Sequence, residues 1–270
     1  MPEQFTIFGA NGFIGRAMVD HLRSLGHEVL ECTRNNWPAK NTDLGHVIYA
    51  AGMTSHYAKV PFETVRSQTT LPAQILEEYK YSSFLYLSST RFYAGAAASD
   101  EQAKFEISPT DPNDIYTLTK TTAECLCLSH PSKNVRVVRL SNVYGQFTKN
   151  IVSLASILDE AVRTGSVEFL SSPQSAKDYI SLNDVVSILP KIALRGNKRI
   201  YNVAKGANTS NEEIANVLEQ EGVRITFRQN APTLVSPQIN VERLTTEFDR
   251  AKSELLEELP ALLDFARQKQ

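Results

Sequence analysis

The strongest constraint on the fold is a glycine-rich turn near the N-terminus, set between an apolar strand and an amphipathic helix. Residues 4–9 (QFTIFG) are apolar and partly β-branched or aromatic, as expected of a buried strand. The turn GANGFIG follows, and apolar residues then recur at helical spacing over residues 14–25, up to Gly26. Residues 29–32 predict a second strand. This order of strand, turn, helix and strand is typical of a parallel sheet.

The alternation of strands and helices continues through the first half of the chain. Residues 35–43 (NNWPAKNTD) predict a loop, because they are short and broken by proline and asparagine. We therefore expect an α/β fold with a doubly wound parallel sheet and helices on both faces. Further strands are expected at residues 44–51, 83–87 and 135–140, and helices at residues 62–81 and 116–130.

The pattern changes after about residue 146, which predicts a second, smaller unit. We expect a first unit over residues 1–150 and a small C-terminal α/β lobe over residues 151–270. Within the lobe, helices are expected at residues 151–163, 182–194 and 211–221, strands at 167–170 and 199–203, and a helical tail at 244–268 interrupted by Pro260.

Composition excludes several classes of protein. The chain has 28 Lys and Arg against 30 Asp and Glu, and no basic cluster, so no nucleic-acid partner is expected. Three cysteines (Cys32, Cys125 and Cys127) form no disulfide framework, and five scattered histidines predict no metal site. The chain has neither a basic leader nor a run of about 18 apolar residues, so we expect a cytoplasmic protein without a membrane partner.

Three motifs carry chemistry. Gly9, Gly12 and Gly15 would let a pyrophosphate approach backbone N–H groups at the positive end of the first helix, which predicts a dinucleotide site. Tyr116 and Lys120 lie four apart in a predicted helix and so share one face. Hydroxyl side chains at residues 88–90 follow a predicted strand, whose carboxyl end should line the ligand crevice.

In this order the motifs resemble the extended short-chain dehydrogenase/reductase family, specifically its NAD-dependent epimerase/dehydratase group that acts on nucleotide sugars. The resemblance spans about residues 5–206 and implies a Rossmann-type NAD(P)-binding domain at residues 1–150 and a substrate-binding lobe after it. Besides the glycine turn, it rests on LYLSSTRFYAG (85–95), VRLSNVYGQ (138–146), KDYISLNDVV (177–186) and YNVAKG (201–206).

The resemblance implies a role for each matching residue. Tyr116 would exchange a proton with a sugar hydroxyl or ketone, and Lys120 would lower the pKa of Tyr116 and bind the nicotinamide ribose. Ser89, or alternatively Thr90, would orient the reacting oxygen. The implied substrate-binding residues are Ser89, Arg91, Asn142 and Lys177, and the implied cofactor-binding residues are Gly9, Asn11, Gly12, Phe13, Ile14, Gly15, Thr33, Arg34, Ala50, Ala51 and Gly52, with Tyr116 and Lys120.

Departures from the family pattern narrow the expected reaction. Dehydratases of the group carry an acidic pair after the catalytic hydroxyl, where this chain has Thr90 and Arg91, so dehydration is not expected. Thr33 stands at the usual acidic position after the second strand, and Arg34 follows it, which favours NADP over NAD. Arg66 stands where we align a family asparagine.

We therefore expect an NAD(P)-dependent oxidoreductase that reduces a 4-keto nucleotide sugar or epimerises a nucleotide sugar at C4. Two alternatives stay open: a reductase of non-sugar carbonyl compounds, and a non-catalytic, dinucleotide-binding regulatory protein on the same fold. The resemblance also implies a possible homodimer.

Overall fold

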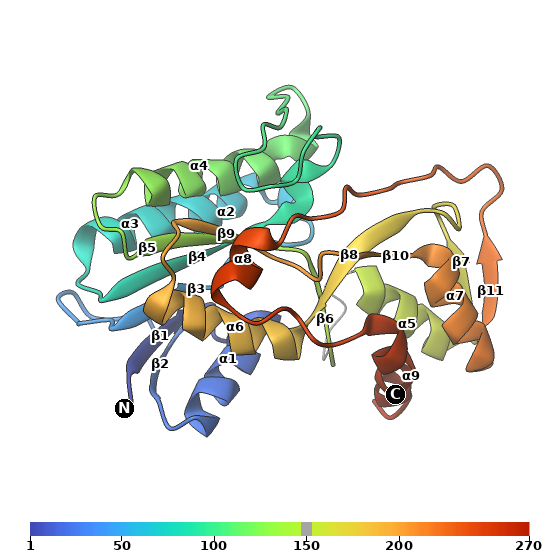
Figure 1. Ribbon diagram of the computed structural model, residues 1–270, viewed down its shortest axis with the longest axis horizontal. Coiled ribbons are helices and arrows are strands. Elements are labelled where there is room, and N and C mark those ends of the chain that lie inside the picture. Colours follow the sequence, from blue (N-terminus) through green and yellow to red (C-terminus); the bar gives the residue numbers. More distant parts are fainter. Residues whose placement is uncertain (147–152, 270) are drawn as a thin grey trace.

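The computed structural model describes residues 1–146 and 153–269, and a six-stranded sheet lies at its centre (Figure 1). The strand order is β2-β1-β3-β4-β5-β9, and every neighbouring pair is parallel. The predicted Rossmann-type sheet is thus confirmed. Its strands are β1 (Gln4–Phe8), β2 (Glu28–Cys32), β3 (His46–Tyr49), β4 (Ser83–Ser89), β5 (Val135–Leu140) and β9 (Ile200–Val203).

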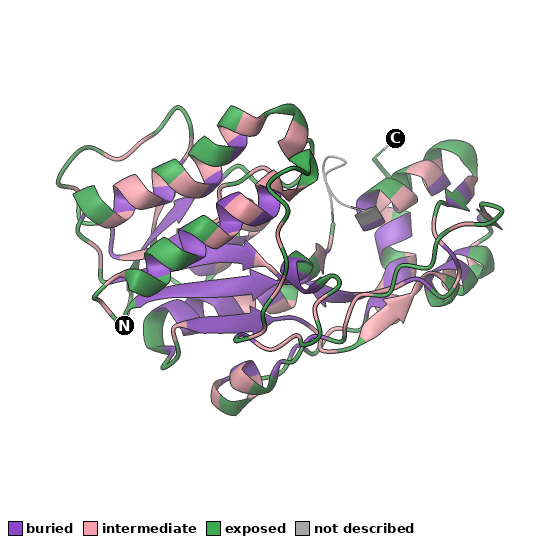
Figure 2. Ribbon diagram, turned by 90° about the horizontal axis from the view of Figure 1, so that it is seen from above, coloured by how far each residue is buried: buried purple, intermediate pink, exposed green. Residues whose placement is uncertain are grey.

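Helices cover both faces of this sheet. Helices α1 (Phe13–Ser24) and α6 (Leu182–Arg195) pack on one face, and α3 (Leu71–Glu78) and α4 (Ile115–Ser129) pack on the other (Figure 1). Figure 2 shows that the central strands are buried for most of their length. The strands are almost continuously apolar because neither face meets solvent.

Strand β2 lies at the edge of the sheet. In the usual doubly wound order another strand lies outside this position, but here β2 is followed by the loop that the sequence predicts. The Trp37 ring in this loop packs on Phe8 at 5.0 Å between centroids, and its Nε1 donates to the Tyr79 hydroxyl at 3.0 Å. An indole therefore covers the core at a place where a helix would usually do so.

A second unit lies beyond the carboxyl ends of the strands. It contains a three-stranded sheet in the order β10-β8-β6 and a two-stranded sheet of β11 and β7, packed with three helices around their own apolar core. The elements are β6 (Asn142–Tyr144), α5 (Ser153–Thr164), β7 (Ser166–Phe169), β8 (Ala176–Ser181), β10 (Asn208–Ser210), α7 (Asn211–Gln220), β11 (Arg224–Phe227) and α9 (Leu255–Arg267).

The two units are interleaved along the chain. Helix α6 and strand β9 belong to the first unit but lie in sequence between β8 and β10 of the second. Helix α8 (Glu242–Glu247) also returns to the first unit, where Leu244 joins the core beneath the sheet. The expected boundary at residue 150 falls outside the described residues, and the division there stays a prediction.

Two helix predictions need correction. The helix expected at 62–81 is continuous over residues 61–78, but it contains a π-helical turn (Arg66–Thr70) between α2 (Pro61–Val65) and α3, and it ends at Glu78. The tail expected at 244–268 is interrupted at residues 248–254 rather than at Pro260, which lies inside α9. The break forms there because the Asp184 carboxylate accepts hydrogen bonds from backbone N–H groups of Lys252 and Ser253. The first two residues of the helix expected at 151–163 lie outside the described residues.

Neither a membrane span nor a metal site is found in the part of the chain that the structure describes. No helix within residues 1–146 and 153–269 is long and apolar enough to cross a bilayer. Over the same residues, His, Cys, Asp and Glu side chains form no group of three or more that could hold a metal ion.

Candidate active site

A cavity of about 950 Å³ lies at the carboxyl ends of the sheet strands, where the second unit faces the first. Parallel sheets bind ligands at this edge because loops from several strands converge there. The lining combines the start of α1, the residues that follow β3, β4 and β5, the start of α4, part of β8, and a segment before α8. The candidates among its residues are Gly12, Phe13, Ile14, Ala50, Ala51, Gly52, Ser89, Thr90, Arg91, Tyr116, Lys120, Asn142 and Lys177.

The glycine turn brings the chain unusually close to itself. Gly9 has a φ of +80°, and a Cβ on it would lie 2.7 Å from the Ala51 backbone nitrogen. A Cβ on Gly15 would lie 2.1 Å from the Gly9 carbonyl oxygen. Helix α1 starts directly above this turn, and no acidic residue lies in its first turn. The positive helix end is thus open to a phosphate, and the turn fits a dinucleotide pyrophosphate.

Gly15→Ala is expected to weaken dinucleotide binding by at least about 10-fold, because the added methyl group must displace the turn that positions the phosphate-binding N–H groups. Fluorescence titration with NADPH and NADH measures this effect. Gly26→Ala is the control for the added methyl group: a Cβ there meets nothing within 4 Å, although Gly26, unlike Gly15, has a positive φ of +80°. Equal losses of binding in both variants would contradict the proposed role of the turn.

The end of β2 lies against the glycine turn, because the backbone N–H groups of Gly9 and Ala10 both donate to the Cys32 carbonyl. Thr33 and Arg34 follow this strand but do not line the cavity, and neither do Gly9, Asn11 and Gly15. The Arg34 side chain is exposed and forms no ion pair among the described residues. Arg16, by contrast, lies 3.6 Å from Asp20 and 3.9 Å from Glu31.

Tyr116 and Ser89 meet at the base of the cavity. Tyr116 lies in the first turn of α4 and is 8% exposed, and it lines the cavity together with Ser89 at the end of β4. Burial raises the pKa of Tyr116, while the Ser89 hydroxyl and the charge of Arg91 act to lower it. Thr90, the alternative to Ser89, also lines the cavity, but the hydroxyl that acts on the Tyr116 pKa is that of Ser89.

Lys120 lies one helical turn after Tyr116 and is buried. Its ammonium donates to the Leu87 carbonyl at 2.7 Å and lies 4.8 Å from the centre of the Tyr86 ring. Burial lowers the pKa of Lys120 to about 8, an effect that Glu124 partly opposes. The charge of Arg91 acts to lower the Tyr116 pKa, whereas the Lys120 ammonium donates to a strand carbonyl.

Three of the expected substrate-binding residues converge above this pair. Arg91 lies over the ring faces of Tyr57 and Tyr116, at 5.1 and 5.6 Å from the ring centres. Lys177 on β8 faces the same cavity, and burial and then the charge of Arg91 lower its pKa. The Asn142 amide donates to the Asp178 carbonyl at 2.8 Å, which links β6 to β8 and leaves its oxygen available to accept.

The structure also reveals residues that the sequence did not single out. Gln68 is fully buried, accepts a hydrogen bond from the Thr119 hydroxyl at 2.8 Å and donates to the Met53 carbonyl at 2.7 Å. It thereby joins the π-helical turn to α4 and to the loop after Gly52. Arg66, which we had aligned with a family asparagine, is exposed and pairs with Glu63 at 2.6 Å. Helical periodicity misses Gln68 because a π turn changes which residues face inward.

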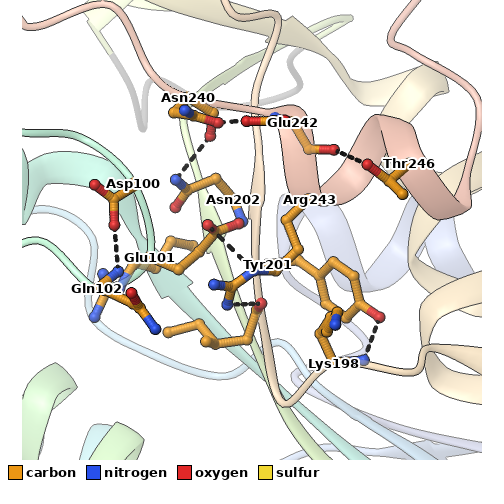
Figure 3. A network of polar contacts seen from close by, with 12 residues as sticks. Asp100, Glu101, Gln102, Lys198, Tyr201, Asn202, Asn240, Glu242, Arg243 and Thr246 are labelled. Carbon is orange, nitrogen blue, oxygen red and sulfur yellow. Dashed lines mark hydrogen bonds and ion pairs between the residues drawn. The ribbon is translucent and has the colours of Figure 1, made fainter.

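A buried network holds two walls of the cavity together. Asn202 on β9 donates through its amide to the Asn240 carbonyl at 2.9 Å (Figure 3). The same amide donates to the Ser99 carbonyl, also at 2.9 Å. Its backbone N–H donates to Glu101, which lies 3.5 Å from Arg243. The loop after β4 and the segment before α8 are therefore fixed to the same strand, next to the places where Ala94, Gly95 and Ile239 line the cavity.

Comparisons with known proteins agree with this architecture. The chain is 27% identical over 159 residues to a dTDP-glucose 4,6-dehydratase from Streptomyces griseus, a match that covers 56% of this chain and 46% of that protein, or about half its length. A structure of MoeE5 in complex with UDP-glucuronic acid and NAD has a TM-score of 0.80, with 19% identity over 99% of this chain and 100% of that one.

A structure of RMD from Pseudomonas aeruginosa complexed with NADPH has a TM-score of 0.76, with 18% identity over 98% of this chain and 99% of that one. At these identities, the likeness to the two solved structures concerns the fold. The model of the NAD dependent epimerase/dehydratase family matches residues 5–204, which contain the glycine turn, Tyr116, Lys120, Arg91 and Lys177. The chain belongs to the NAD dependent epimerase/dehydratase family.

Proposed function

We propose that this protein is an NAD(P)-dependent oxidoreductase that acts on a nucleotide-activated sugar, by 4-keto reduction or by epimerisation at C4. The observation that carries the proposal is that Tyr116, Ser89 and Lys120 line one cavity together with the N-terminal end of α1. A dinucleotide on that helix end and a sugar above Tyr116 would share the cavity. A protein that only sensed dinucleotide would have no use for these three side chains.

In the proposed mechanism, the nicotinamide ring supplies or accepts the hydride. Tyr116 donates its phenolic proton to the sugar oxygen during reduction and takes it back during oxidation. Ser89 donates to the same oxygen and fixes its distance from Tyr116. Lys120 would bind the nicotinamide ribose, and Lys177 and Asn142 would hold the diphosphate. Burial of Tyr116 excludes water from the proton transfer.

The lining of the cavity favours these reactions over dehydration. Among the described residues that line it, Asp178 is the single acid, and its carboxylate accepts the backbone N–H groups of residues 205–207. No lining carboxyl group is thus available to expel a sugar hydroxyl. The relative from Streptomyces griseus is a dehydratase by its description, so the two proteins are proposed to differ in this step.

Reductases and epimerases differ in whether the cofactor leaves between half-reactions. An epimerase returns the hydride to the same sugar and keeps its NAD bound, whereas a reductase must exchange NADP. Mass spectrometry and an absorbance scan of cofactor released from the purified protein separate the two. Stoichiometric NAD favours epimerisation. A panel of keto-sugar nucleotides against simple ketones then tests the substrate class, and turnover of simple ketones alone would contradict the proposal.

We propose that Arg34 gives the protein a preference for NADP. Its guanidinium lies in the loop after β2 without an acidic partner among the described residues, where it could contact a ribose 2′-phosphate. Arg34→Ser is expected to weaken NADPH binding by about 10-fold or more, as loss of a charge-assisted hydrogen bond implies, and to affect NADH binding much less. Lys40→Ser, in the same loop, controls for the general loss of positive charge. NADH binding at least as tight as NADPH binding by the unaltered protein would contradict the preference.

A homodimer stays a prediction. Phe62 on α2 is 84% exposed and Leu126 on α4 is 39% exposed, so both helices offer apolar side chains to a second copy. Sedimentation velocity measures the oligomeric state directly.

A further inference from the structure

Arg91 is a positively charged residue that lines the cavity directly beside Tyr116. No carboxylate among the described residues forms an ion pair with it, and its guanidinium instead rests on the faces of Tyr57 and Tyr116. Such rings hold a guanidinium in place without neutralising its charge. Its backbone N–H donates to the Ser89 Oγ at 3.1 Å. The Arg91 backbone is therefore held next to Ser89, while its exposed side chain reaches the Tyr116 ring and lines the cavity.

Lys177 is a second cation of this kind, on the opposite wall. It is partly buried on β8 and forms no ion pair with a described residue. The only acidic side chain in the described lining, Asp178, is turned toward three backbone N–H groups. The charge of Arg91 disfavours the protonated form of Lys177, which means that the two cations repel each other. Bound negative charge would remove this repulsion.

The two cations would contact different groups of a bound sugar nucleotide. Lys177 belongs to the second unit, away from the proton-transferring pair, where the diphosphate is proposed to lie. Arg91 follows Ser89 by two residues and covers the Tyr116 ring, so its partner must be carried by the sugar ring close to the reacting carbon. A neutral hydroxymethyl group there would leave the guanidinium unpaired, whereas a carboxylate accepts two parallel N–H bonds from it.

We propose that Arg91 binds a carboxylate on the sugar ring, and that the substrate is a nucleotide-activated uronic acid. This inference rests on the proposed function and adds the chemical class of the sugar. In this arrangement Arg91 binds the sugar carboxylate and Lys177 binds the diphosphate of the same substrate molecule.

The experiment compares two ligands that differ only at C6, UDP-glucuronic acid and UDP-glucose, by isothermal titration calorimetry with saturating NADPH. The unaltered protein should bind the uronic acid more tightly, by about 10- to 100-fold, the usual worth of a charge-assisted pair in a partly enclosed site. Arg91→Met should abolish this ratio of affinities, and Arg91→Lys should restore part of it. Lys177→Met is the matched control and should weaken both ligands together. Circular dichroism confirms that each variant is folded.

The ratio of the affinities for the two ligands isolates the contact with the carboxylate, because any effect of Arg91 on the Tyr116 pKa applies equally to both ligands. Equal affinity of the unaltered protein for the two ligands would overturn the inference. An equal loss of affinity for both ligands in Arg91→Met would also overturn the inference, because it would indicate that Arg91 contacts the diphosphate, which the two ligands share. In both cases the proposed function survives if a neutral nucleotide sugar is bound and turned over. Failure of every nucleotide sugar to bind would instead refute the proposed function, and this inference with it.

Discussion

Tyr116→Phe is expected to lower turnover by about 10²- to 10⁴-fold, the usual contribution of one positioned acid–base group. The variant loses only the phenolic hydroxyl, next to Ser89 in the lining of the cavity. Because the ring remains, its packing against Tyr57 at 5.1 Å and beneath Arg91 is retained. Dinucleotide affinity should change little, since the proposed pyrophosphate site is the turn before α1. Steady-state turnover of a nucleotide sugar and titration with NADPH measure the two quantities.

Tyr57→Phe is the matched control for this variant. It removes a neighbouring phenol that raises the pKa of Tyr116 but has no proposed role in proton transfer. A much smaller loss of turnover is expected. If Tyr116→Phe keeps its turnover, Tyr116 does not transfer the proton; if both variants lose it equally, the effect comes from the local packing.

Arg139→Met is expected to destabilise the protein by about 3–5 kcal/mol, the cost of leaving one partner of a buried ion pair without the other. The side chains of Arg139 and Glu124 are 6% and 4% exposed, and their closest atoms lie 2.6 Å apart. Burial alone would lower the pKa of Arg139, but its hydrogen bonds with Glu124 raise it. Arg139 also donates to the Tyr93 hydroxyl at 2.7 Å, which in turn donates to Asn202. Urea denaturation measures the change in unfolding free energy.

The double variant Arg139→Met/Glu124→Leu should recover part of the lost stability, because neither partner of the pair is then left buried without the other. The recovery is incomplete because the buried Lys120 ammonium loses the opposing charge of Glu124. A surface pair, Arg66 and Glu63, offers the contrasting case, and Arg66→Met should cost at most about 1 kcal/mol. A loss in Arg139→Met as small as that in Arg66→Met would show that the pair contributes little. Because the pair supports the Asn202 network, we also expect weaker substrate binding at the wall of the cavity.

The fold and part of the site could be predicted from the sequence because their signals are local. The turn after β1 needs glycine at Gly9 because its φ is +80°, and at Gly15 because a Cβ there would meet the backbone of Gly9 and Ala10. Strand β5 is a continuous run of residues buried on both faces, which periodicity recognises. The loop that contains Trp37 could also be predicted, because proline and asparagine interrupt both the helical and the strand pattern of apolar residues.

Other features depend on contacts between distant residues. The break before α9 is held by Asp184, more than 60 residues earlier, so Pro260 was the wrong signal. The π-helical turn that directs Gln68 inward has no period that a helical pattern would report.

The sequence by itself determined which groups are available: a glycine turn, a tyrosine and a lysine one helical turn apart, and hydroxyls after a strand. Only the tertiary structure decided which of them act on one another. It directed the Lys120 ammonium to the Leu87 carbonyl and placed the charge of Arg91 where it acts on the Tyr116 pKa. The reason is physical: glycine turns and helix faces are set by backbone sterics within a few residues. The electrostatic environment that sets the pKa of a side chain, in contrast, depends on burial and on charges that come from separate parts of the chain.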